Sequence, residues 1–217
     1  MTARPTVVFD FDGTLALGSG PLEAYLGALA DLTGSGAATR ACRGALEQFE
    51  TGASPHRDAY DAVRTAALAE GIADTDLSRA YLASREQLGT EAGAVSSPAG
   101  LVEFLTGLRE HATLVLATNA PDIGVGRALS SLGIAALIDE RHHNVGKPAG
   151  LAPIIAEHLQ HGPVLSVGDI WEFDLEPAER LGADTALVGV RDVPAAQPTF
   201  RGASLTDLYD DLSAWTL

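Results

Sequence analysis

The sequence contains almost no lysine and almost no cysteine. Lys147 is its only lysine, and all the other residues among the 14 basic ones are arginines. Cys42 is its only cysteine, which excludes an intrachain disulfide, so nothing in the chain requires an oxidising compartment. Cys42 lies in a helical stretch, where we expect a buried packing residue; a reactive thiol is the alternative.

The sequence also lacks long apolar runs and an excess of positive charge. No run approaches the ~20 residues of a membrane span, and Asp10 interrupts the short run Val7–Phe9, so we predict neither a membrane anchor nor a signal peptide. With 29 acidic residues against 14 basic ones, the net charge is −15. Such a surface repels nucleic acid and anionic membranes. The surface also repels a phosphorylated metabolite, so an enzyme for such substrates needs a local positive site. Without a predicted anchor or signal, we expect a soluble cytoplasmic protein, and we take a monomer or homodimer as its form.

Short apolar runs rich in β-branched residues predict buried strands. They lie at Thr6–Phe9, Thr113–Ala117, Ala136–Ile138, Val164–Val167 and Ala186–Val190. Helical patterns separate the later runs, at Asp122–Leu132, Ala149–Leu159 and Asp174–Leu181. This alternation predicts an α/β fold, a Rossmann-like parallel sheet between two helical layers.

The interval between the first two predicted strands far exceeds the dozen or so residues of a βαβ crossover. Apolar residues recur there at helical spacing, as at Leu22, Leu26 and Leu29, and glycine-containing stretches separate the periodic segments. We predict that residues 18–95 form an inserted helical domain and that 1–17 and 96–217 form the α/β core. A helix over Ala99–Glu110 would re-enter the core.

The first predicted strand ends in Asp10-Phe11-Asp12-Gly13-Thr14, at the sheet edge where open α/β proteins bind ligands. An Asp-Gly turn after a strand is common. The four-residue pattern DxDGT, however, is expected by chance in a chain of this length only about once in a thousand. We therefore predict a functional site at this turn.

Other polar residues follow the later strands. Thr118 and Asn119 could donate to phosphoryl oxygens, although Asn119 equally suits a helix cap. Lys147 precedes a helix, where a lysine is normally solvated, but a compact ammonium also suits a phosphoryl group bridged to a carboxylate. Asp169 follows the strand at Val164–Val167. Asp174 would start the next helix, where an aspartate often serves simply as an N-terminal cap, so a functional role for it competes with capping.

These motifs together resemble the haloacid dehalogenase superfamily. They are Asp10-x-Asp12-Gly13-Thr14, Thr118, Lys147-Pro148 and Gly168-Asp169-x4-Asp174. The helical insertion is similar to the cap of its phosphatases, such as the phosphoglycolate phosphatase type. The resemblance implies the strand order 3-2-1-4-5 and Mg²⁺-dependent hydrolysis of a small phosphorylated metabolite.

What the resemblance implies for the catalytic residues is specific. Asp10 would be the nucleophile that forms an aspartyl-phosphate, and Asp12 the general acid and then base. Thr118 would hydrogen-bond the phosphoryl group, and Lys147 would neutralise charge between it and Asp10. The protonation of Asp12 stays open, because nearby carboxylates raise its pKa whereas a cation lowers it.

The resemblance also implies a metal site. Asp10, the backbone carbonyl of Asp12, and Asp169 would bind Mg²⁺, which prefers a few carboxylates with water and phosphate oxygens. Asp174 would support the metal or orient Lys147. Dehalogenases of the family lack an acid at the position of Asp12, so its presence favours phosphate chemistry.

Several alternatives and weaker candidates remain open. The inserted domain has no lysine, which excludes a Schiff-base phosphonate hydrolase and weakens a phosphomutase. A phosphotransferase or a silent binding protein would share the same motifs. Arg57 is the first candidate for a contact with an anionic group of the substrate. Trp171 could form a wall of the substrate pocket, or it could be a packing residue of the core. Neighbouring histidines usually point apart, so His142-His143 predicts a solvated loop rather than a metal site.

Overall fold

The computed structural model describes residues 4–52, 54–190, 193–194 and 196–217. The chain divides into two compact units. The core unit comprises Met1–Leu17, Ser96–Asp122 and Leu129–Leu217, and the helical unit comprises Gly18–Val95 and Ile123–Ala128. The helical unit thus contains the predicted insertion together with a short later segment, which includes the start of helix α6 (Val125–Ser131).

The core unit is built on a six-stranded sheet in the order β3-β2-β1-β4-β5-β6. Its strands are β1 (Thr6–Phe9), β2 (Thr113–Ala117), β3 (Glu140–His142), β4 (Val164–Gly168), β5 (Asp184–Val188) and β6 (Phe200–Gly202). All neighbouring pairs are parallel. Every residue of β1 and β4 is buried, as expected for strands covered on both faces. The predicted fold class and strand order are confirmed, with β6 as an additional edge strand.

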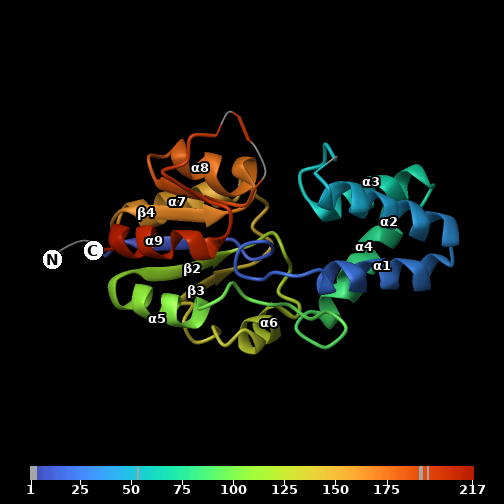
Figure 1. Cartoon of the computed structure of the whole chain (residues 1–217), viewed down its shortest axis with the longest axis horizontal. Helices are drawn as coiled ribbons and strands as arrows, with labels where there is room; N and C mark the ends of the chain where they lie inside the picture. Colours follow the sequence, from blue (N-terminus) through green and yellow to red (C-terminus); the bar gives the residue numbers. More distant parts are fainter. Residues whose placement is uncertain (1–3, 53, 191–192, 195) are drawn as a thin grey trace. The chain divides into compact units, whose positions relative to one another are not determined.

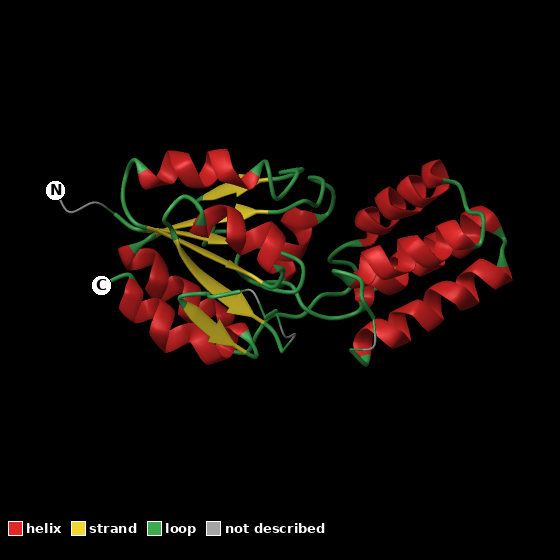
Figure 2. Ribbon diagram, turned by 90° about the horizontal axis from the view of Figure 1, so that it is seen from above, coloured by secondary structure: helices red, strands yellow, loops and turns green. Residues whose placement is uncertain are grey.

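Helices cover both faces of this sheet (Figure 2). The longer ones are α5 (Leu101–His111), α7 (Leu151–Leu159) and α9 (Tyr209–Trp215), with the short α8 (Glu176–Glu179) and the single turns Trp171–Leu175 and Leu205–Leu208. Leu151 and Ile155 of α7 pack with Val8 and Val115 in one apolar cluster. Phe104 of α5 stacks on Tyr209 of α9, with ring centroids 4.0 Å apart. These contacts fix the helices that flank the strand ends.

The helical unit is a bundle with its own apolar core. Its main helices are α1 (Gly20–Thr33), α2 (Gly36–Glu50), α3 (Ala59–Ala69) and α4 (Asp74–Gln87), which are grouped together in Figure 1. Leu22, Leu26 and Leu29 of α1 are buried in one cluster with Cys42 of α2. Cys42 is fully buried, so the expectation of a packing residue is confirmed.

The strand predicted at Ala136–Ile138 is wrong. That run lies in the connection from α6 to β3, where Leu137 donates a backbone hydrogen bond to Ile134. The third strand is instead the polar segment Glu140–His142. As an edge strand it is partly exposed and needs no continuous apolar run, so the apolar criterion missed it. His142 consequently ends a strand, and the prediction that it lies in a solvated loop is also wrong.

The element after β4 also differs from the prediction. The helix predicted at Asp174–Leu181 is divided into a wide π-type turn, Trp171–Leu175, followed by α8. Such insertions in helices are frequent at functional sites. Among the described residues, none of the helices has the length and apolar character that crossing a membrane requires.

Candidate active site

Three strands of the core unit end beside one another and present polar residues at the same edge of the sheet. In the parallel register Phe9 of β1 lies opposite Leu116 of β2 and Val167 of β4. Asp10, Thr118 and Asp169 follow these three strands directly. The register therefore gathers the first, second and fourth motifs, as the sequence predicts for the carboxyl edge of a parallel sheet.

Lys147 reaches this edge from the connection between β3 and α7. Its Nζ lies 2.6 Å from Oδ1 of Asp10 and 2.7 Å from Oδ1 of Asp174, and only 3% of the side chain is exposed. Its backbone N–H donates a hydrogen bond of 2.7 Å to Oδ1 of Asn119. Burial alone would lower the pKa of Lys147, but the Asp10 and Asp174 carboxylates outweigh burial and hold this pKa above its usual range. The ammonium is therefore charged at any physiological pH.

Asp10, Asp169 and Asp174 form an acid cluster beside this ammonium. Each offers a carboxylate oxygen, and these oxygens all lie within 4.8 Å of one another. Burial, and after it the Asp10 carboxylate, raises the pKa of Asp174 to about 6. The same two causes raise the pKa of Asp169 well above the normal range. Crowded carboxylates of this kind favour a bound cation, which relieves their mutual repulsion.

An unpartnered carboxylate oxygen is a second feature of the acid cluster that fits a divalent metal. Oδ1 of Asp169 is buried and has no hydrogen-bond partner among the described residues. A buried carboxylate oxygen without a partner is costly, and a metal ion would satisfy it. Asp174 differs, because its two oxygens already accept from Lys147 Nζ and from the backbone N–H of Ile170, the latter at 3.0 Å. Because both of its oxygens are already engaged, Asp174 is suited to orienting Lys147 and to supporting a metal indirectly, through the other carboxylates of the cluster.

Two glycines allow the motifs to approach so closely. Gly13 has a φ of +91°, and a Cβ atom there would lie 2.6 Å from Oδ2 of Asp169. A Cβ atom at Gly168 would collide with the side chain of Asp174. Each motif glycine thus makes room for a carboxylate from the fourth motif, and the positive φ of Gly13 also lets the chain turn sharply after Asp12.

The structure adds Ser166 to the residues that sequence reasoning identified. Its hydroxyl donates a hydrogen bond of 2.6 Å to the backbone carbonyl of Asp174, and this bond is buried. Ser166 thereby fixes the turn that carries Asp174. A polar residue inside the otherwise apolar run Val164–Val167 was the available signal.

Thr118 and Asn119 belong to the same edge and shape the loop after β2. The hydroxyl of Thr118, a residue only 2% exposed, accepts from the backbone N–H of Ala120 at 3.0 Å. Asn119 holds the Lys147 backbone through its side-chain oxygen. Both residues therefore lie in contact with the Lys147 loop or the turn beside it, and phosphate binding by them stays a prediction.

The remaining predicted residues have different surroundings. Asp12 is half-buried on the loop after Asp10 and, among the described residues, its carboxylate is not part of the acid cluster. Trp171 is 5% exposed and packs with Leu175 and Leu187, which agrees with a packing role. Arg57 is an exposed residue of the helical unit, 3.4 Å from Oδ1 of Asp61. The metal and substrate roles of these three residues stay predictions.

The sheet order, the carboxylates at its carboxyl edge and the buried lysine define a Rossmann-like α/β core with an acid site that suits a metal ion. Residues 7–166 match the profile of the haloacid dehalogenase-like hydrolases. This match covers well over half of the chain, so the chain belongs to that family. The family resemblance of its motifs is confirmed. No match was found among curated protein sequences.

Solved structures with the same fold cover almost the whole chain. YfnB from Bacillus subtilis, described as a HAD hydrolase bound to magnesium, is 19% identical with a TM-score of 0.67, covering 98% of this chain and 99% of YfnB. A HAD phosphatase from Thermococcus onnurineus is 18% identical with a TM-score of 0.60, covering 96% and 97%. A 2-haloacid dehalogenase from Pseudomonas syringae is 16% identical with a TM-score of 0.59, covering 99% and 100%. At these identities the likeness establishes the fold, and both phosphatases and dehalogenases share it.

Proposed function

We propose that this hydrolase is a Mg²⁺-dependent phosphatase of small phosphorylated metabolites, with Asp10 as its covalent nucleophile. The observation that carries the proposal is the pairing of Lys147 Nζ with Asp10, 2.6 Å away, beside the carboxylates of Asp169 and Asp174. A buried ammonium next to a partly buried carboxylate provides what an attack on an anionic phosphoryl group requires. It lowers the repulsion between two anions that must approach.

Asp10 would attack phosphorus through a carboxylate oxygen and form an aspartyl-phosphate, which water then hydrolyses. Lys147 would hold the attacking carboxylate in place and stabilise negative charge on the phosphoryl oxygens. Mg²⁺ bound by Asp10, Asp169 and the Asp12 backbone carbonyl would supply further charge neutralisation and align the phosphate. The metal-bound structure of the similar YfnB supports this choice of ion.

Asp12 is the residue that favours phosphate over halide chemistry. The alcohol that leaves a phosphate ester needs a proton, whereas a departing halide does not. Asp12 lies two residues after Asp10 on the same loop, where it would donate that proton and later deprotonate water. Some solved structures of this fold are named dehalogenases, so halide release is the alternative outcome to be measured.

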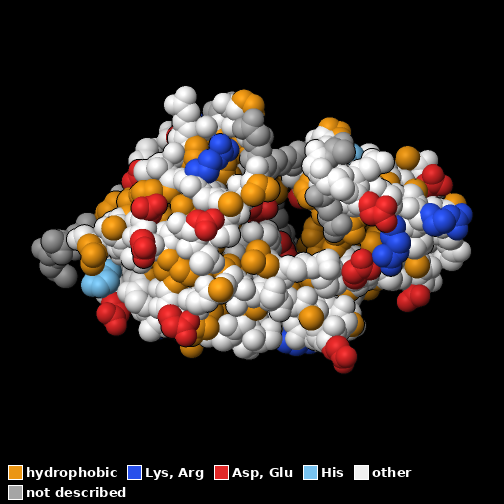
Figure 3. Space-filling view, in the orientation of Figure 1, with side chains coloured by type: hydrophobic (Ala, Val, Ile, Leu, Met, Phe, Trp, Pro, Cys, Tyr) orange, Lys and Arg blue, Asp and Glu red, His pale blue; other side chains and the backbone are white. Residues whose placement is uncertain are grey.

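The helical unit would act as the cap that encloses the substrate and selects its leaving group. Arg57 is proposed as an anion contact from this unit, and Trp171 as a wall on the core side. Thr118, Asn119 and Lys147 would bind the phosphoryl group itself. On the face shown in Figure 3, acidic side chains are scattered and basic ones form only small separate groups, so the described residues of this face form no broad basic patch of the kind that binds nucleic acid.

The test is a phosphate-release screen of the full chain with Mg²⁺ against phosphorylated metabolites. We expect turnover that chelation abolishes and that Asp10→Asn abolishes as well. Asp211→Asn, a change of the same kind at an exposed position of α9, is the matched control and should retain full activity.

Two parallel measurements separate the alternatives. Halide release from 2-haloacids, with no phosphate release from any ester, would contradict the phosphatase. Transfer of the phosphoryl group to an added alcohol, without free phosphate, would indicate a phosphotransferase instead. Full activity of Asp10→Asn would remove the proposed nucleophile.

A further inference from the structure

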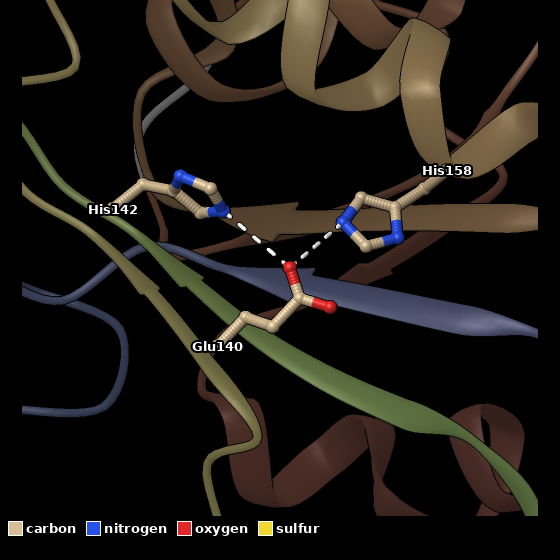
Figure 4. Close-up of side chains that lie close together, drawn as sticks. All are labelled: Glu140, His142 and His158. Carbon is tan, nitrogen blue, oxygen red and sulfur yellow. Dashed lines mark ion pairs between the residues drawn. The ribbon is translucent and has the colours of Figure 1, made fainter.

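A second group of metal-ligating side chains lies at the edge of the sheet and uses none of the residues of the acid cluster. Glu140, His142 and His158 each offer one ligand atom, and these atoms lie within 4.8 Å of one another. Figure 4 shows both imidazole rings directed towards the same carboxylate oxygen. Nε2 of His142 lies 3.7 Å from Oε2 of Glu140, and Nε2 of His158 lies 3.5 Å from it.

Secondary structure explains why these three side chains converge. Glu140 and His142 are two residues apart on β3, so their side chains point to the same face of the sheet. His158 is in the last turn of α7, the helix whose Leu151 and Ile155 pack on the neighbouring strands. The packing of α7 thus brings one imidazole opposite the edge strand.

We propose that Glu140, His142 and His158 bind a transition-metal dication, of which Zn²⁺ is the best match. A tetrahedral ion with bonds of about 2.1 Å places its ligand atoms about 3.4 Å apart. The two nitrogen–oxygen distances, 3.7 and 3.5 Å, are close to that value. Two imidazoles and a carboxylate suit Zn²⁺, whereas the all-carboxylate cluster suits the harder Mg²⁺.

The hydrogen-bond surroundings of the ring nitrogens of His142 and His158 support a role as metal ligands. Nε2 of His142 is buried and has no hydrogen-bond partner among the residues that the structure describes. Nδ1 of His158 lies 3.4 Å from the hydroxyl of Thr6. A proton on that Nδ1, shared with Thr6, leaves the lone pair on Nε2, which faces Glu140. Such a hydrogen bond on the far ring nitrogen is the usual way in which a metal-binding histidine is oriented.

The position of the site gives the metal a structural effect. The chain runs from β3 through the Lys147 loop into α7, so Glu140 and His158 flank the segment that carries Lys147. The His142 carbonyl also accepts a backbone hydrogen bond from Thr118 at 2.9 Å. An ion held by both ends of this segment would tie α7 to the edge strand. The side chain of Glu140 is 47% exposed, so water can complete the coordination.

The test is calorimetric titration of the chelator-treated full chain with Zn²⁺ in excess Mg²⁺. To exclude Zn²⁺ binding by the acid cluster, the titration is repeated in Asp169→Asn. We expect one bound Zn²⁺ in both proteins. We also expect Glu140→Gln and His142→Ala to bind at least about 100-fold more weakly, because each removes a direct ligand. His161→Ala, which removes an exposed histidine just after α7, is the matched control and should bind as the wild type.

Two further measurements separate loss of Zn²⁺ binding from loss of folding and report the coordination geometry. The thermal midpoint of each variant without metal reports its folding. Zn²⁺ should raise this midpoint in the wild type, Asp169→Asn and His161→Ala, but not in Glu140→Gln or His142→Ala. Co²⁺ in place of Zn²⁺ should give the visible absorption of tetrahedral coordination, and Glu140→Gln should lose it. Equal Zn²⁺ affinity of wild type, Glu140→Gln and His142→Ala would overturn the proposal, as would no binding by the wild type. Neither result bears on phosphate release.

Discussion

The amine of Lys147 lies 2.6 Å from Oδ1 of Asp10, although the two residues are 137 positions apart in the chain. The same amine contacts Asp174 at 2.7 Å, so one buried ammonium is shared by the buried carboxylate of Asp174 and the partly buried carboxylate of Asp10. Removing either side of such a group leaves uncompensated charge in a largely buried site. The site is therefore expected to be sensitive to substitution in both activity and stability.

Lys147→Met should abolish turnover and destabilise the fold. Loss of the ammonium leaves Asp10 and Asp174 without their buried partner, at a cost of about 3–5 kcal/mol in the free energy of unfolding at neutral pH. Phosphate release should fall by at least about 100-fold, since charge stabilisation of the phosphoryl group is lost. Urea denaturation and a phosphate-release assay measure the two effects. Unchanged unfolding of Lys147→Met would show that the pairing contributes nothing to stability.

Asp12→Asn should separate the two halves of the reaction. The amide cannot donate a proton to the leaving group or activate water, so both steps slow. With an activated ester, whose leaving group needs no proton, the aspartyl-phosphate should still form and then accumulate. Mass spectrometry of the quenched protein would detect phosphate on Asp10. Burst kinetics identical to the wild type would contradict the acid/base role.

Gly13→Ala should weaken Mg²⁺ binding and destabilise the core unit by about 2 kcal/mol. A φ of +91° is unfavourable for alanine, and its Cβ would lie 2.6 Å from Oδ2 of Asp169. Gly182→Ala is the matched control, because it has a φ of +83° with nothing within 4 Å of the added Cβ. The control should lose about 1 kcal/mol from backbone strain alone. Equal losses of stability and equal Mg²⁺ affinity in the two variants would exclude the steric contribution of Asp169.

The Arg109–Asp139 pair should make the free energy of unfolding depend measurably on pH in the acid range. Burial tends to raise the pKa of Asp139, but hydrogen bonds from Arg109 and from the backbone of Leu114 outweigh it and lower this pKa below 3.8. A carboxyl whose pKa is lower in the folded state stabilises the fold above its unfolded pKa. That stabilisation is lost as the pH falls through the lower, folded pKa.

Asp139→Asn should therefore lower the free energy of unfolding by about 1–2 kcal/mol at pH 7. The difference from the wild type should shrink as the pH falls below the ordinary carboxyl range. Urea denaturation at a series of pH values measures it, with the exposed Asp211→Asn as control. A difference that grows towards low pH would have the wrong sign for this pair.

Cys42 should react with a thiol reagent only when the helical unit opens. Its side chain is fully buried, and burial raises the pKa of its thiol, so little thiolate is present at neutral pH. Labelling should be slow in buffer and accelerate with urea in step with unfolding of the helical unit. Rapid labelling of the native protein would contradict the burial of Cys42.

Local sequence pattern predicts the residues of the acid site and the strands that carry them. Asp10, Thr118 and Asp169 each follow an apolar run, and the carboxyl ends of parallel strands meet at one edge, so their proximity followed from local pattern. The rarity of lysine singled out Lys147. Periodicity also separated the helical insertion from the core, because a period of 3.6 residues differs clearly from a short apolar run.

Contacts between side chains of different elements, in contrast, depend on how those elements pack. The edge strand Glu140–His142 is polar, so no apolar run marked it, and the contact of its residues with His158 depends on how α7 packs on the sheet. The bond from Ser166 to Asp174 and the space beside Gly13 likewise depend on distances between separate loops. Local pattern shows which face of an element is apolar, whereas packing sets which faces, and hence which polar atoms, come into contact.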